Sequence, residues 1–237
     1  MQMIALIVVA GLGMMAIEAL RPARPLPRVR GFWPRAVALN LAQAGAVVLV
    51  GLTFDRWFSG QSIFSLGTWP SVAAVATAYL VSSFIYYWWH RARHEVPLLW
   101  RACHQVHHSV SRLSVIAAYY KHPLEFLCNS LLSTLIAYPL LGLTPLQAGW
   151  VTAICGLAEF FYHWNVRTPR WLGWIIQRPE MHRVHHRRGH HRHNFADLPL
   201  IDLCFGTFFN PRRADGPCGF HGDREQRLRA MLAFRDL

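Results

Sequence analysis

The stretch that decides the fold runs from residue 90 to residue 108 and reads HRARHEVPLLWRACHQVHH. It holds His90 and His94 as an H-x3-H pair, followed by His104, His107 and His108 as an H-x2-H-H motif. Residues three or four apart lie on one face of an α-helix, so we expect the histidines of each motif to point in one direction. Several imidazoles on one face are what a metal site built from helices requires.

A second H-x2-H-H motif lies far downstream and consists of His182, His185 and His186. Between the two motifs, His163 ends an apolar run, and all 14 histidines lie between His90 and His221. One pair of histidines can arise by chance on a basic helix, and the run 190–193 could be a solvated loop. Three separate clusters beside long apolar segments instead predict a metal site made of many histidines.

The composition argues against a soluble protein. The chain has 237 residues, 53% of them hydrophobic, with ten tryptophans. Its formal charge of +12 comes almost entirely from arginine, because Lys121 is the only lysine. Such a charge can indicate nucleic acid binding, but here the arginines lie beside apolar runs, which indicates a membrane surface and no nucleic acid partner. The five cysteines form no C-x-x-C motif, so neither a disulfide framework nor a zinc ribbon is expected.

The apolar runs predict an all-α polytopic membrane protein. Residues 3–20, 36–54 and 71–89 are each long enough to cross a bilayer as a single helix. Residues 124–143 and 146–164 form a further apolar pair, broken at 144–145, and we interpret them as a helical hairpin. The histidine clusters follow the ends of these segments and should form a helical cap.

The loop charges predict the topology. The loop 21–35 carries five arginines, whereas the loop 55–70 carries one. Because positive loops stay in the cytoplasm, the N-terminus should lie outside, and the histidine cap and the C-terminus should be cytoplasmic. We expect an integral protein of a bacterial inner membrane. A short amphipathic helix is predicted within the tail, over residues 223–234.

Glu159 lies four residues before His163 in an apolar segment. An ionisable residue at membrane depth is functional by default, so Glu159 could be a metal ligand or a partner of one. The alternative is a carboxylate that pairs with an arginine. No basic residue lies within a helical turn of Glu159, which slightly favours a role at the site.

From about Ala78 to Pro211 the chain resembles the fatty acid hydroxylase superfamily, also called the sterol desaturase family. The resemblance rests on motifs in a fixed order, which besides the histidine clusters include Tyr87-Trp88-Trp89, Leu99-Trp100-Arg101, His122-Pro123-Leu124-Glu125, Phe161-Tyr162-His163-Trp164-Asn165 and the block 202–207. It divides the chain into N-terminal membrane helices (1–70), a fatty acid hydroxylase-like domain (71–211) and a cytoplasmic tail (212–237).

The resemblance implies a membrane oxygenase whose histidines hold two iron ions at the cytoplasmic face. Its O2-dependent reaction would hydroxylate or desaturate a C–H bond of a lipid, such as a sterol or a fatty acyl chain, and a separate reductase or other electron donor would supply electrons. Glu159 stands where some members have a second histidine, and His122, His190, His191 and His193 are additional candidates at the edge of the site or on the surface. The implied ligands are His90, His94, His104, His107, His108, His163, His182, His185 and His186.

Two other classes remain open. One is a zinc-dependent membrane hydrolase or isomerase, which would need a positioned carboxylate, with Glu159 the only obvious candidate. The other is a membrane protein that binds or transports metal without catalysis. That class is expected to have polar residues throughout its spans, whereas the histidines here lie at helix ends.

Overall fold

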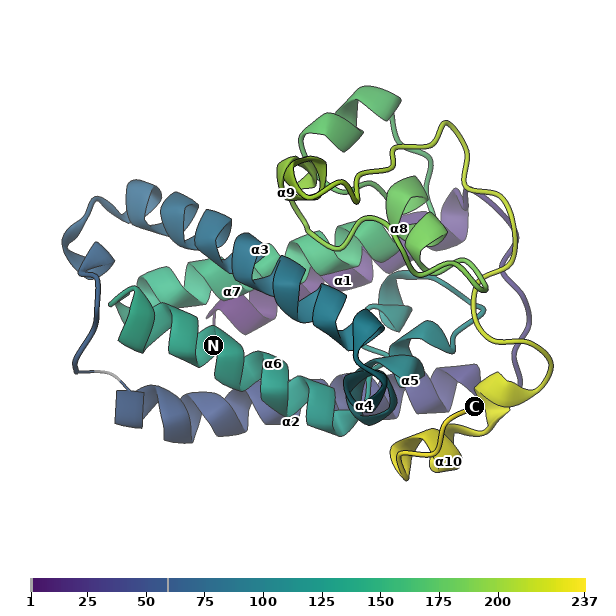
Figure 1. Ribbon diagram of the computed structural model, residues 1–237, viewed down its shortest axis with the longest axis horizontal. Helices are drawn as coiled ribbons and strands as arrows, with labels where there is room; N and C mark the ends of the chain where they lie inside the picture. Colours follow the sequence, from purple (N-terminus) through teal and green to yellow (C-terminus); the bar gives the residue numbers. More distant parts are fainter. Residues whose placement is uncertain (1, 59) are drawn as a thin grey trace.

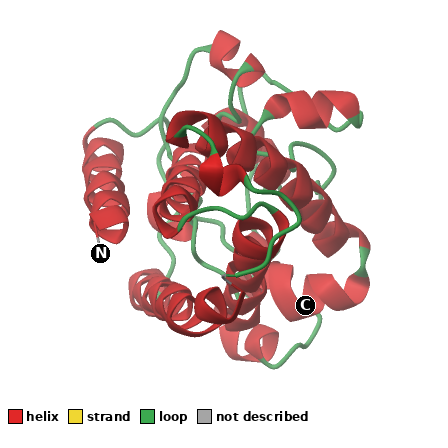
Figure 2. Cartoon of the chain, turned by 90° about the vertical axis from the view of Figure 1, so that its left-hand side faces the viewer, coloured by secondary structure: helices red, strands yellow, loops and turns green. Residues whose placement is uncertain are grey.

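The computed structural model describes residues 2–58 and 60–237. Within these ranges the chain is helical and contains no strand, apart from an isolated bridge between Arg187 and Cys218 (Figure 2). The all-α prediction is therefore confirmed. The α-helices are α1 (Gln2–Leu20), α2 (Phe32–Phe58), α3 (Ser71–Glu95), α4 (Pro97–Leu99), α5 (Gln105–His108), α6 (Pro123–Leu135), α7 (Pro145–His163), α8 (Pro179–His185), α9 (Pro199–Cys204) and α10 (Leu228–Leu232).

Three of the described helices are long and apolar enough to span a membrane, namely Met3–Leu20, Phe32–Phe58 and Ser71–Glu95. The three predicted single spans are thus confirmed. The second helix extends four residues beyond the prediction at each end, and its first residue, Phe32, is buried. The third continues past the aromatic residues 86–89 to Glu95, so that His90 and His94 remain on a helix.

The predicted hairpin is formed by α6 and α7. Pro123 begins α6 at its first turn, where the missing N–H costs nothing, and the ring of His122 accepts a hydrogen bond from the backbone of Leu124. The helix then continues as a π-helical turn over Ile136–Leu140 that includes Pro139. Thr144 and Gln147 form a capping box that begins α7, which explains the predicted break.

The long helices form a bundle, and their packing gathers the histidines at one end. Helix α2 packs on α6, while α1 and α3 both pack on α7. The C-terminal end of α3 lies near α4 and α5, toward the right of the bundle in Figure 1, where α8 and the C-terminus also lie. A π-helical turn over Trp100–His104 joins α4 to α5, and 3₁₀ turns lie at Leu66–Thr68, Val115–Ala117, Arg170–Trp174 (η5) and Arg224–Gln226.

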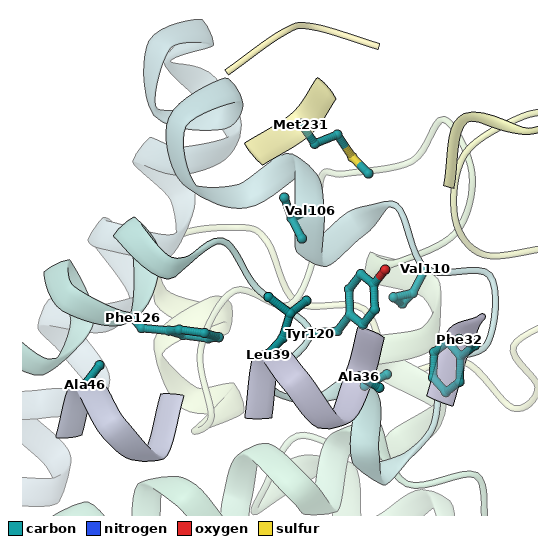
Figure 3. Packing of buried hydrophobic residues seen from close by; sticks show 10 residues of the cluster. Phe32, Ala36, Leu39, Ala46, Val106, Val110, Tyr120, Phe126 and Met231 are labelled. Carbon is teal, nitrogen blue, oxygen red and sulfur yellow. The ribbon is translucent and has the colours of Figure 1, made fainter. Parts of the chain in front are cut away.

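The C-terminal tail helps to close the cap. It is shorter and more broken than the predicted helix, because a 3₁₀ turn precedes the five-residue α10. Met231 of α10 is nevertheless fully buried. It packs in one cluster with Val106 of α5, Tyr120 and residues of α2 and α6 (Figure 3). The tail therefore holds the first H-x2-H-H segment against the membrane helices.

Candidate metal centre

The nine predicted histidines fall into two groups in the structure. Within each group, one ring nitrogen of every member lies within 4.8 Å of the corresponding nitrogen of each other member. The first group, here called group A, comprises His90, His94, His104, His108 and His185. The second, group B, comprises His107, His163, His182 and His186.

The two groups are in direct contact. The ring of His108 in group A stacks on the ring of His186 in group B, with centroids 4.1 Å apart and planes at 9°. His107 of group B lies 5.6 Å from His108 by the same measure. The nine imidazoles thus form one buried cluster with two centres, in accord with a two-metal site.

The expectation that each H-x2-H-H motif points in one direction is wrong. His104 and His108 face group A, whereas His107 faces group B; in the second motif His182 and His186 face group B, whereas His185 faces group A. Consecutive helical residues diverge by about 100°. The i and i+4 histidines therefore stay together, and the i+3 histidine can reach a second centre on the other side.

Hydrogen bonds at Nδ1 orient several rings. The Nδ1 of His90 donates to the carbonyl oxygen of Phe195 at 2.9 Å, and that of His185 donates to the carbonyl of His193 at 2.8 Å. His163 donates in the same way to the carbonyl of Glu159 at 2.8 Å. Such bonds leave the Nε2 lone pair for a metal. Among the described residues, the buried Nε2 atoms of His90 and His185 have no hydrogen-bond partner.

His104 is held by a carboxylate instead of a carbonyl. Its Nδ1 lies 3.1 Å from Oε1 of Glu125 on α6. Glu125 is fully buried and also pairs with the guanidinium of Arg93 on α3. This carboxylate–histidine contact is common around metal sites. Glu125 was not among the predicted site residues, although a carboxylate at the start of an apolar helix is a signal for one.

Burial favours the neutral form of His104, His107 and His185. It lowers the pKa of His185 to about 3 and that of His104 well below the usual value, since an imidazolium loses its hydration inside the cluster. For His107, burial is again the first cause of the lowered pKa, and the nearby His186 adds to it. Neutral imidazoles have the free lone pair that binding a metal requires.

Glu159 belongs to neither group of candidate metal ligands. Its carboxylate forms an ion pair with Lys121, and the two side chains are 17% and 7% exposed. No basic residue lies within one turn of Glu159 in the sequence, but Lys121 precedes α6 and reaches α7 across the fold. The ion-pair alternative therefore describes the structure, with lysine in place of arginine.

The remaining candidate histidines lie outside the two groups. His122 caps α6, and His190 and His193 contact each other beside the cap, with ring nitrogens 2.8 Å apart. His191 is the nearest of them to the site, since its ring centroid lies 4.8 Å from that of His108.

The donor set fits two transition metal ions. Every member of groups A and B is an imidazole, a ligand suited to zinc, copper, iron and nickel. Imidazoles bring no charge that would cancel that of the ion. The groups hold five and four candidate ligands.

Comparison with known proteins agrees with this site. Residues 75–207, more than half of the chain, match the sequence profile described as fatty acid hydroxylase. The ornithine lipid hydroxylase OlsE of Rhizobium tropici is 35% identical over 161 residues, which are 65% of this chain and 47% of the relative. Human alkylglycerol monooxygenase is 32% identical over 144 residues, 59% of this chain and 32% of the relative.

A third relative, the fatty acid hydroxylase vlmA of Lecanicillium sp, is 31% identical over 166 residues, which are 60% of this chain and 44% of that protein. The matched regions therefore span less than half of these three relatives. No solved structure gives a significant match.

Proposed function

The chain belongs to the fatty acid hydroxylase family, and from this premise we propose that it is an O2-dependent membrane enzyme that oxidises a C–H bond of a lipid with two iron ions. The observation that carries the proposal is the pair of buried histidine groups, which contact each other through the stacked rings of His108 and His186. Two bound irons would supply the activation of O2. The names of the relatives, which include an ornithine lipid hydroxylase and an alkylglycerol monooxygenase, support a lipid substrate.

The reaction balances with two electrons and two protons. In hydroxylation, R–H, O2, two electrons and two protons give R–OH and water; in desaturation, the same oxidant removes two hydrogens and gives two waters. We propose that a separate protein donates the electrons. The arginine-rich cap would favour an acidic donor, because complementary charges speed association.

The role of the chain is to position the ligands and to exclude water. Aromatic rings pack against both groups: Phe195 lies 5.5 Å from His90 and 5.4 Å from His185 between centroids, and Tyr162 lies 4.3 Å from His182. An apolar wall keeps water from reacting in place of the substrate. Since α3 carries His90 and His94 directly after its membrane-spanning part, a lipid chain could reach the site from the bilayer.

We further propose that the site lies on the cytoplasmic side. The support is the distribution of arginines, because the loop 21–35 packs on the cap. The backbone N–H of Ala23 donates to the carbonyl of Asn165 at 2.7 Å, and Arg24 donates to the carbonyl of Ala214 at 2.5 Å.

The test is an isotope experiment on the whole protein in lipid nanodiscs. The protein is loaded with iron without oxygen, reduced chemically, and mixed with ¹⁸O2 and a lipid extract. We expect two irons per chain, lipid-dependent O2 uptake and either ¹⁸O in a lipid or a new double bond. His107→Ala should lower the iron content and abolish both the lipid-dependent O2 uptake and the change in the lipid. A protein that holds only zinc and hydrolyses a lipid, or one that binds metal and leaves every lipid unchanged, would refute the proposal.

A further inference from the structure

The cap exposes an apolar surface that the fold leaves uncovered. It is formed by η5 with Ile175 and by α9 with Phe205. These two segments contact each other. We call this surface the shelf; its exposed side chains are Trp171, Trp174, Ile175, Leu200, Leu203 and Phe205. Trp171, Ile175 and Leu200 are each at least 60% exposed. Large contiguous apolar surfaces of this kind indicate a partner or a membrane.

The shelf continues the outer face of a membrane-spanning helix. Phe205 packs on Trp88 of α3 with centroids 4.8 Å apart, and on Phe84 at 6.1 Å. Phe84 and Trp88 are themselves 45% and 42% exposed. Because α3 is one of the three candidate spans, its exposed apolar face is covered by lipid. An apolar surface that continues this face should also contact lipid.

The charges around the shelf fit a phospholipid surface. Arg167 and Arg170 are exposed and lie four residues and one residue before Trp171. Residues 166–213 contain three acidic side chains, Glu180, Asp197 and Asp202, and none of these is exposed. Exposed arginine and tryptophan side chains beside an apolar face are typical of segments that lie in the membrane interface.

The inner side of α9 contacts the loop that orients a histidine of group A. Asp202 accepts hydrogen bonds from the backbone N–H groups of Phe195 and Ala196 at 2.8 and 3.0 Å. The carbonyl of Phe195 in turn orients His90. One face of this short helix thus points away from the protein, while Asp202 on the other face holds the Phe195 backbone that orients His90.

We propose that the shelf is immersed in the lipid interface, so that η5 and α9 lie on the membrane surface as a second point of membrane attachment. The apolar face, its continuity with α3 and the flanking arginines all select a lipid surface as the occupant. Immersion would place lipid against the outer face of α9, so that only this helix and the loop at Phe195 would separate the lipid from group A. This inference depends on the membrane spans and not on the reaction catalysed.

Spin labelling of the whole protein in nanodiscs of phosphatidylcholine and phosphatidylglycerol tests the proposal. Cys204 of α9 is exposed, Cys103 and Cys218 are buried, and Cys128→Ala and Cys155→Ala remove the two partly exposed thiols. The label on Cys204 is then probed by collision with O2, which concentrates in lipid, and with a water-soluble nickel complex.

The aqueous control carries Cys204→Ser and His221→Cys in the same background, because His221 is an exposed residue of the tail. A second variant, Leu200→Cys with Cys204→Ser, reports from the same face of α9 one turn earlier. We expect a ratio of O2 to nickel collisions several-fold higher at residues 200 and 204 than at residue 221.

Equal ratios at all three positions would overturn the proposal, since the shelf would then face water. Protection of residues 200 and 204 from both reagents would also overturn it, because another protein or a second copy would then cover the shelf. Gel filtration of each labelled variant confirms that it is folded before the comparison is made.

Discussion

Glu125 provides the sharpest test of how the cap holds its metals. In Glu125→Gln the side chain keeps its shape, but the amide carries no negative charge to hold Nδ1–H of His104 and the guanidinium of Arg93. Loss of an outer partner of a metal-binding histidine typically costs about 10–100-fold in metal affinity. That range corresponds to roughly 1.4–2.8 kcal/mol.

The effect should fall on group A, because His104 belongs to that group. We expect the ion held by group A to be released at a chelator concentration about 10–100-fold lower than in the parent protein, while group B keeps its ion. The assay is dialysis of the iron-loaded protein against a graded series of chelator, followed by metal analysis. Glu125→Ala is less informative, since it leaves Arg93 buried without its carboxylate at a cost of about 3–5 kcal/mol.

Glu225→Gln is the matched control. Glu225 is also a buried glutamate, but it accepts hydrogen bonds from the backbone and hydroxyl of Ser111 and belongs to neither histidine group. It should lose some stability and retain both metals. The reasoning about Glu125 is refuted if Glu125→Gln and Glu225→Gln release both ions at the same chelator concentration as the parent protein.

The topology, the ligand assignment and the ion pair of Glu159 can each be tested separately. Reporter fusions at Gly60 and at the C-terminus should give opposite signals, because the arginine-rich loop 21–35 is expected to stay in the cytoplasm; matching signals would contradict this topology. His107→Ala should weaken the metal of group B and His185→Ala that of group A, with membrane insertion intact because the apolar spans need no metal; full metal content in both variants would refute the ligand assignment. Glu159→Gln should keep both metals and lower the melting temperature modestly, since it weakens the ion pair with Lys121; loss of an iron would show that the carboxylate is a ligand after all.

The elements of the fold could be predicted from the sequence because their signals are local. A run such as 3–20 is apolar over the thickness of a bilayer wherever it lies in the molecule, and Thr144 with Pro145 begins a helix by its own capping chemistry. The histidine spacings were informative for the same reason. The division of the chain at residues 70 and 211 stays a prediction.

The contacts of Glu125 and Glu159 show where local signals end. Glu125 lies 32 residues from Arg93, and Glu159 lies 38 residues from Lys121. No periodicity relates residues so far apart, so the helical spacing around Glu159 does not reveal Lys121 as its partner. The structure brings each pair together through the packing of the helices that carry them.

The sequence by itself determined that the protein crosses a membrane, that it is helical and that nine histidines are available at helix ends. Tertiary structure alone decided how the nine histidines divide between group A and group B. Helical spacing sets the direction of His107 relative to His108, but it does not say which other segment lies in that direction. That depends on how α3, α5, α7 and α8 meet, and their packing places His185 with His90 and His163 with His107.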